Sequence, residues 1–234
     1  WTDVSGGISG LTGLVENNSI WLGSDPSGTT STADSNVALG TTALDAITTG
    51  DNNTAVGYAA GTALTTGTLN NLIGKDAGTA ITTGQANNLI GTLCGDAITT
   101  GSENIGIGHA TLGALTTASN NVALGSNSMM SATTGTGNTA VGYATLDALT
   151  TSNNNTAIGY AALGANTTGT TNTAVGAYAG DAITTGSNNT AVGYAALTSL
   201  TTSSKHVAIG EGASASVTTG QYSTSVGYNA LYSL

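Results

Sequence analysis

Hydrophobic and polar positions recur along the chain with one fixed period, and each repeat carries a glycine at the same place. A single insertion would displace every later side chain from its column, so this register predicts units that stack in one fixed geometry. We therefore expect one 17-residue coil per repeat. The glycines of the series are Gly23, Gly40, Gly57, Gly74, Gly91, Gly108, Gly125, Gly142, Gly159, Gly176, Gly193, Gly210 and Gly227.

Two apolar positions in each repeat predict two short strands. The residue before the fixed glycine is aliphatic in every copy, as at Val56, and we expect it to face the core. Alternation along this strand then places Thr54 inward and Ala55 outward. The second apolar series lies seven residues after the glycine and is interrupted by a smaller or polar residue at two places. Its members are Ile47, Leu64, Ile81, Ile98, Leu115, Ala132, Leu149, Asn166, Ile183, Leu200 and Val217.

A pair of threonines follows the second apolar position in each of these coils, and a glycine often comes next, as at Gly67. β-Branched residues favour an extended chain and glycine turns it. In this second strand we expect Leu64 and Thr66 to point inward, with Ala63 and Thr65 outward. The predicted class is therefore all-β, because a helix would need a sustained apolar stripe and would lose about 1 kcal/mol at each glycine.

Asparagine occupies the position four residues before the fixed glycine in ten copies. Stacked coils bring these amides within hydrogen-bonding distance of one another, and asparagine also tolerates left-handed turn conformations. We expect a ladder of side-chain amides that also satisfies the backbone of the turn. Its members are Asn36, Asn53, Asn70, Asn87, Asn104, Asn121, Asn138, Asn155, Asn172 and Asn189, with Ser19, His206 and Ser223 at the same position in other copies.

The predicted domain organisation is an N-terminal cap or junction over residues 1–18 and a β-solenoid of thirteen repeats over residues 19–234. We expect Trp1 and Trp21 to close the end of the apolar column, because a terminal coil lacks a neighbour on one side. The stretch 25–28 contains the only proline of the chain and is predicted to be a turn. We also expect the chain to be a fragment or a processed piece of a longer protein.

Composition points to self-association. Phenylalanine is absent and alanine, glycine, threonine and asparagine dominate, so a single solenoid buries little apolar surface and is marginally stable. The outward strips of alanine and threonine allow close approach of a second copy, most simply with rotational symmetry about the long axis. Packing against identical copies would supply the missing burial.

The charge balance excludes two classes of partner. Lys75 and Lys205 are the only basic residues against twelve acidic ones, and the formal charge of −10 repels nucleic acid and anionic membrane surfaces. No apolar run approaches the roughly 18 residues that a membrane-spanning helix requires. Few lysines and arginines also mean few sites for trypsin, which suits a protein on a virion or on an extracellular surface.

Candidate chemistry is sparse, so we expect no enzyme activity, no cofactor and no metal site. Cys94 lies where other repeats carry alanine and is expected to be a packed small residue. His109 and His206 are more than five coils apart, too far for a joint site. Asp45, Asp96, Asp147 and Asp181 share one repeat position, but the closest two are two coils apart, about 10 Å, so they cannot share a calcium ion within a chain. Calcium bridging between copies is left open.

A tyrosine stripe is the one candidate binding feature. These side chains directly follow the fixed glycine and are expected to form an exposed row, which either packs between chains or stacks on the sugar rings of a glycan receptor. The residues are Tyr58, Tyr143, Tyr160, Tyr194 and Tyr228.

Several segments resemble repeats of known fibrous proteins. NSIWLG at 18–23 and NVALG at 36–40 and 121–125 resemble the Asn-Ser-Val-Ala-Ile-Gly repeat of trimeric autotransporter adhesin heads, as does HVAIG at 206–210. NTAVGYAAL at 189–197 also resembles repeats of bacteriophage tail fibres. The resemblance covers nearly the whole chain from residue 18. It implies a left-handed parallel β-roll that assembles as a homotrimer and has adhesin or receptor-binding roles.

The favoured function is a rigid trimeric tail-fibre segment that supports host attachment. Its partners would be itself, other fibre or tail proteins and a host surface glycan or receptor. The head of a bacterial cell-surface adhesin is one alternative. The other is an ice-binding solenoid, because every threonine pair could order water. Adjacent threonines point to opposite faces, however, and leave one exposed file per strand where a Thr-x-Thr array would give two.

Overall fold

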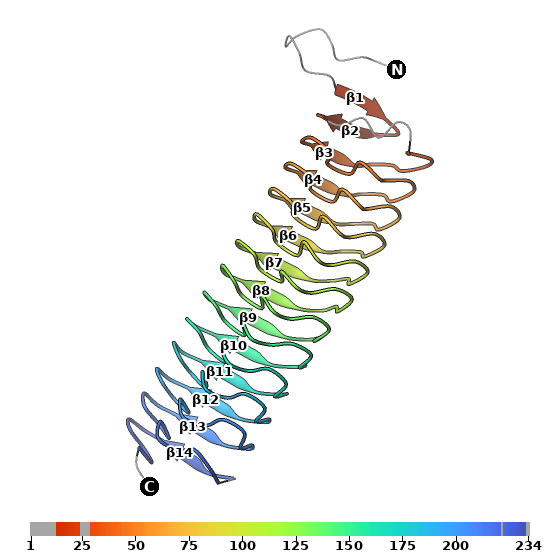
Figure 1. Cartoon of the computed structure of the whole chain (residues 1–234). Helices are drawn as coiled ribbons and strands as arrows, with labels where there is room; N and C mark the ends of the chain where they lie inside the picture. Colours follow the sequence, from red (N-terminus) through yellow and green to blue (C-terminus); the bar gives the residue numbers. More distant parts are fainter. Residues whose placement is uncertain (1–12, 24–28, 221, 233–234) are drawn as a thin grey trace. The chain divides into compact units, whose positions relative to one another are not determined.

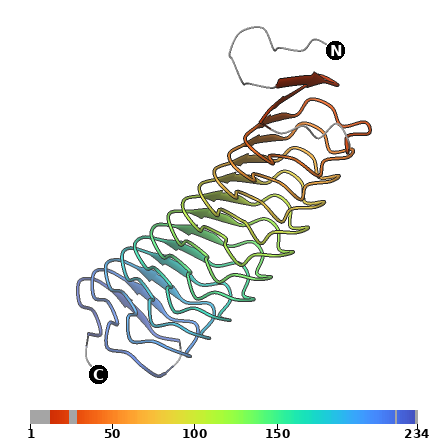
Figure 2. The same ribbon diagram turned by 45° about the horizontal axis from the view of Figure 1, so that its top comes forward.

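The computed structural model describes residues 13–23, 29–220 and 222–232, and no helix occurs among them. The chain divides into two compact units, unit 1 (Trp1–Ala118) and unit 2 (Ser119–Leu234). Each unit is a parallel β-solenoid with one short strand per coil (Figures 1 and 2). The all-β solenoid predicted from the repeat is therefore confirmed.

In unit 1, β1 pairs with β2 in an antiparallel manner, and the six strands from β2 to β7 pair with one another in parallel, in chain order. Thr54 is opposite Asn71 and Val56 is opposite Ile73, so each coil takes one full repeat of the sequence. The strands are β1 (Gly13–Glu16), β2 (Ser19–Leu22), β3 (Val37–Leu39), β4 (Thr54–Val56), β5 (Asn71–Ile73), β6 (Asn88–Ile90) and β7 (Ile105–Ile107).

Unit 2 has the same arrangement. Its strands pair in parallel in chain order, again with partners one repeat apart, such as Thr156 and Thr173. The strands are β8 (Val122–Leu124), β9 (Thr139–Val141), β10 (Thr156–Ile158), β11 (Thr173–Val175), β12 (Thr190–Val192), β13 (Val207–Ile209) and β14 (Thr224–Val226).

The strand phase is opposite to the one predicted. Ala55, the middle residue of β4, is fully buried, whereas Thr54 and Val56 face outward and are half-buried. The residue before the fixed glycine therefore does not face the core, and in β3 Leu39 is 47% exposed. The self-association strip predicted from Ala55 is wrong as well, because the outward side chains of the strand are larger.

The width of the coil explains this phase. The wall opposite each strand fills the interior with residues such as Leu44 and Leu64, both fully buried. A Cβ added at Gly61 would lie 2.7 Å from Leu72 Cδ1, so the leucine in the middle of β5 fits because the facing position is a glycine. Where Leu44 occupies that facing position, the next strand has Ala55 in its middle. Large and small residues alternate to keep the interior close-packed.

The second apolar series is buried as predicted. Ile47, Leu64, Ile81 and Ile98 in unit 1 are fully inaccessible, as are Leu115 and, in unit 2, Leu149. Asn166 interrupts the series in unit 2 with a buried amide whose nitrogen and oxygen have no hydrogen-bond partner among the described residues. This aliphatic column therefore lies in the interior of successive coils within each unit.

The second strand predicted for each coil does not form in the coils that the structure describes. Ala59 and Gly61 have φ angles of 56° and 60°, so the chain after β4 turns repeatedly. The first threonine of the next pair is half-buried, and its Oγ1 donates a hydrogen bond one coil onward, from Thr65 to the Thr82 carbonyl at 3.0 Å. Thr66, predicted to point inward, is exposed. The threonine segment thus stacks by carbonyl contacts without forming a strand.

The predicted asparagine ladder is confirmed. Asn70 donates its Nδ2 to the Asn53 Oδ1 at 3.0 Å and to the Gly84 carbonyl at 2.9 Å, and its own Oδ1 accepts the backbone N–H of Asn87 at 3.0 Å. The amide therefore joins three coils and closes the turn. The left-handed conformation belongs to the preceding residue, as at Leu69 with φ 62°.

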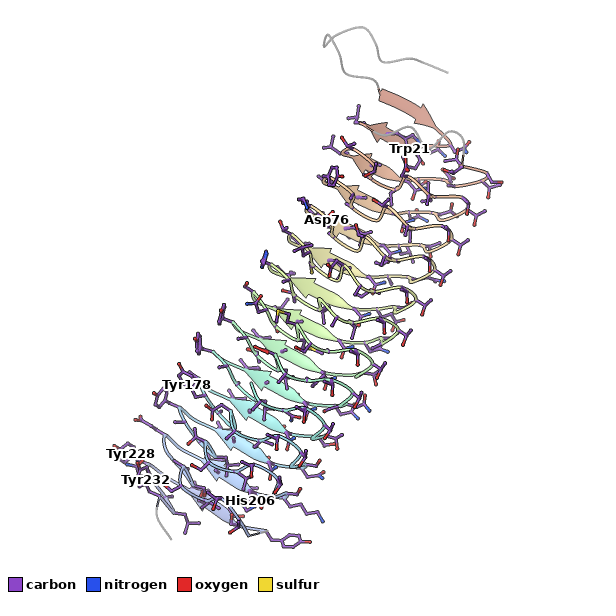
Figure 3. All side chains as sticks on the ribbon, in the orientation of Figure 1. Trp21, Asp76, Tyr178, His206, Tyr228 and Tyr232 are labelled. Atoms are coloured by element: carbon purple, nitrogen blue, oxygen red, sulfur yellow. The ribbon has the colours of Figure 1, made fainter. Side chains whose placement is uncertain are left out.

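The first coil contains the large residue predicted to close the column. Trp21 lies in the middle of β2, opposite Ala38, and is 1% exposed (Figure 3). Residues 1–12 and 24–28 lie outside the described residues, which covers Trp1, most of the predicted cap and the proline turn. Of the predicted cap, the described part contributes β1, which pairs along the edge of β2.

Cys94 fills a gap that a glycine leaves in β7. A Cβ added at Gly106 would lie 2.7 Å from Cys94 Sγ, and Cys94 is fully buried. We expect Gly106→Ala to lower the free energy of unfolding by about 1–3 kcal/mol through overpacking. Adding Cys94→Ala should restore most of the loss, because the double variant then has the residues of a natural coil at these positions, the buried Ala179 and Ala191 with Gly180. Denaturant unfolding of the two single variants and the double variant measures this, and additive losses would contradict it.

Candidate functional site

The predicted tyrosines lie at the exposed edge of the coils where the strands end. Each follows the fixed glycine at the carboxyl end of a strand. They are 49–74% exposed, with Tyr228 the most accessible. The residues placed this way are Tyr58 in unit 1 and Tyr143, Tyr160, Tyr194 and Tyr228 in unit 2. The exposed stripe is therefore present, although its members are not evenly spaced.

Four tyrosines of unit 2 form a continuous row, which we call the tyrosine ladder. Tyr143 and Tyr160 are stacked with ring centroids 5.4 Å apart and an interplanar angle of 16°. Tyr178 meets Tyr160 edge to face at 5.2 Å, and it meets Tyr194 at 6.1 Å and 90°. Figure 3 shows Tyr178 projecting from the edge of its coil. The ladder thus runs through four consecutive coils.

Tyr178 was not among the residues predicted from the repeat. It lies two residues after Gly176, where the other tyrosines of the stripe lie one residue after theirs. Its backbone is left-handed, with φ 58°, and its ring still reaches the rings of the adjacent coils. Desolvation and the neighbouring Tyr160 hydroxyl raise the pKa of Tyr178 above its usual value. A single displaced tyrosine therefore completes the row.

Two tyrosines outside the ladder lie beside the lysines of the chain. Lys75 Nζ lies 5.7 Å from the ring centroid of Tyr58, and the same lysine forms a salt bridge with Asp76. Lys205 Nζ lies 5.1 Å from the ring centroid of Tyr222. Both lysines of the chain thus lie over an exposed tyrosine, a cation–π arrangement that is weak at the surface.

The acidic residues do not gather into a metal site. Among the described residues, no three histidine, cysteine, aspartate or glutamate side chains lie close enough together to hold an ion. Asp45 is exposed. Desolvation raises the pKa of Asp96, Asp147 and Asp181, which share its repeat position in other coils. These carboxylates therefore lie singly along the coils.

Of the remaining candidate groups, Cys94 and His206 are buried in the scaffold. Cys94 is buried as predicted, and burial raises the pKa of its thiol to about 12, which keeps it protonated at neutral pH. His206 occupies the asparagine position, with Nδ1 2.5 Å from Ser223 Oγ and Nε2 donating to the Gly220 carbonyl at 3.1 Å. His109 is exposed in unit 1.

The threonine pairs present one exposed file in each unit. The second threonine of each pair is exposed, as at Thr66, Thr100 and Thr185. The hydroxyl of the first is used within the scaffold, as in the bond from Thr184 to the Thr201 carbonyl at 3.2 Å. A Thr-x-Thr array of an ice-binding surface would present two files of exposed hydroxyls, and these units present one.

The chain matches no protein-family model, no curated protein and no solved structure. Within the described part of the chain, no helix has the length and apolar character needed to cross a membrane.

Proposed function

We propose that the chain is a non-enzymatic segment of a homotrimeric fibre, in a phage tail or a similar surface appendage, that supports attachment to a host. The observation that carries the proposal is the outer strand face, which consists of the first and third residues of β3–β7 in unit 1 and of β8–β14 in unit 2. The number three and the fibre context come from the resemblance of the repeats to adhesin heads and phage fibres.

The outer strand face carries an aliphatic residue and no charge in every coil. Parallel sheets are ordinarily covered on both faces, and exposed apolar strips mark interaction sites. None of the first and third strand residues is charged, although the chain has a formal charge of −10. The most exposed aliphatic side chains on this face are Val37, Leu39, Ile105 and Ile107 in unit 1 and Ile158, Ile209 and Val226 in unit 2.

A second copy of the chain is the partner that fits this face. The contact repeats once per coil, so a partner must present apolar groups with the same spacing along its length. An identical copy has that spacing, and packing around a rotational axis lets every copy bury the same strip. The buried strips would add the apolar contact that each thin coil lacks.

A lysine placed on the outer strand face tests the proposal. We expect the unmodified chain to sediment as a trimer at neutral pH. Ile158→Lys together with Val192→Lys should convert it to a monomer, because the lysines would be desolvated in the contact. The matched control is the same charge change at the exposed threonine file, Thr168→Lys with Thr185→Lys, which should remain trimeric.

Sedimentation equilibrium gives the mass, and circular dichroism checks that each variant keeps its β-structure. A well-folded monomer of the unmodified chain in dilute solution would contradict the proposal. Dissociation of the control to the same extent would show that added charge acts independently of its position. Thermal hysteresis of the purified chain would instead favour the ice-binding alternative.

A further inference from the structure

The tyrosine ladder is confined to one stretch of unit 2, and the uniform outer strand face does not account for it. The four tyrosines lie in consecutive coils. At the position after the fixed glycine, unit 1 has Ser24, Thr41, Tyr58, Lys75, Thr92 and His109. A contact between copies that runs through every coil would require the same chemistry in both units. The ladder therefore has a local role.

The ladder offers aromatic surface and hydroxyl groups together. Its rings are 37–56% exposed and follow one another at 5.2–6.1 Å. Tyr194 ends the row and has one ladder neighbour, so at least one face of its ring is not covered by another tyrosine. Because neighbouring rings cover part of one another's faces, the row offers ring edges along its length and an uncovered face at Tyr194, which suits an extended ligand that stacks at one end and makes edge contacts along the rest.

Charge around the ladder restricts the ligand. Asp147 and Asp181 lie in coils that contribute tyrosines, and no lysine or arginine occurs between Lys75 and Lys205. Phosphate, sulfate and uronate groups would meet net negative charge without a cation to bind them. Sugars without charge avoid this repulsion, because a pyranose ring stacks through its C–H face and its hydroxyls bind phenol and carboxylate oxygens.

We propose that the tyrosine ladder of unit 2 binds a neutral oligosaccharide along the row Tyr143–Tyr160–Tyr178–Tyr194. This inference rests on the proposed function and extends it, because it names the class of receptor that an attachment fibre would contact. The ligand lies along the coil edge, beside the outer strand face, so each copy in an assembly carries its own site.

Binding of defined hexasaccharides to the full assembled chain tests the site. The probes are cellohexaose, chitohexaose and maltohexaose, with hexagalacturonate as the anionic probe, measured by isothermal titration calorimetry. We expect at least one neutral probe to bind and the anionic probe to bind more weakly. Tyr178→Ala with Tyr194→Ala should weaken that binding by about tenfold or more, because the ring with an uncovered face and the ring beside it are lost. Tyr58→Ala, which removes an exposed tyrosine outside the ladder, should leave it unchanged.

The outcomes separate this site from the fibre assignment. If no neutral hexasaccharide binds, or if Tyr58→Ala reduces binding equally, the ladder is not a glycan site. If the double variant loses its trimeric mass, the ladder is a contact between copies and the inference is overturned. If the unmodified chain binds a hexasaccharide as a monomer, the site stands and the trimeric fibre assignment fails.

Discussion

Replacing Gly57 with alanine is expected to lower the free energy of unfolding by more than about 4 kcal/mol, an exceptional value for one methyl group. The added Cβ would lie 2.4 Å from the carbonyl oxygen of Gly74 in the next coil. The contact is with the backbone, so no side-chain rotation relieves it. The φ angle of Gly57, 137°, adds conformational strain for any residue with a Cβ.

Gly227 provides a matched control within the same chain. It is the fixed glycine of the last described coil and has a similar φ of 126°, but a Cβ there would have its nearest neighbour, Ala230 Cβ, at 4.0 Å. Gly227→Ala should therefore cost only the strain, about 1–3 kcal/mol. Denaturant unfolding at one fixed protein concentration compares the two variants. Equal losses of unfolding free energy in the two variants would show that the close approach of the next coil is not the reason why this position requires glycine.

The sequence predicts the coil and its polar ladder because both depend on register. A constant period places every Asn of the series over the next, so Asn53, Asn70 and Asn87 meet through their side-chain amides. The buried second apolar series, as at Ile47 and Leu64, follows in the same way. Both features follow from the stacking of equivalent residues, and the constant period of the sequence is enough to predict that stacking.

The phase of the strand could not be obtained from alternation alone. Thr54-Ala55-Val56 allows two orientations, and hydrophobicity favours the one that buries Val56. The structure buries Ala55 because Leu44 and Leu64 already fill the narrow interior. The sequence does contain a clue to the strand phase, because the large residue in the middle of β5, a leucine, occurs together with a glycine, Gly61, at the facing position. The deciding quantity is interior volume, which a one-dimensional pattern does not express.

The sequence predicted only part of the tyrosine ladder, because repeat position alone does not show which side chains meet. The repeat position identified Tyr143, Tyr160 and Tyr194, but Tyr178 is displaced by one residue and falls outside the series. Tyr178 has the left-handed φ that its repeat position also has in other coils, as at Ala59, and its ring contacts Tyr160 and Tyr194 from there. Contact between neighbouring coils, more than repeat position, therefore defines the ladder.

Loss of one rung of the asparagine ladder is the second large effect that we expect. Asn70→Ala removes the bonds from Asn70 Nδ2 to Asn53 Oδ1 and to the Gly84 carbonyl, and the two bonds that Asn70 Oδ1 accepts from Asn87. Asn70 is 1% exposed, so water does not reach these groups in the intact turn. Unpaired buried groups cost about 1–3 kcal/mol each, and the expected loss is at least about 3 kcal/mol.

The adjacent Asn71 is the control, because its amide faces outward and makes one side-chain bond, from Nδ2 to Asn88 Oδ1 at 3.2 Å. Asn71→Ala should cost less than about 1 kcal/mol. Unfolding in guanidinium chloride gives the stabilities, and amide hydrogen exchange shows whether the loss is local to the coils around Gly84 and Asn87. A ladder rung matters beyond its own coil, since each amide joins the coil before and the coil after. Protection should therefore fall on both sides of Asn70, and a loss restricted to one coil would contradict a ladder that couples its neighbours.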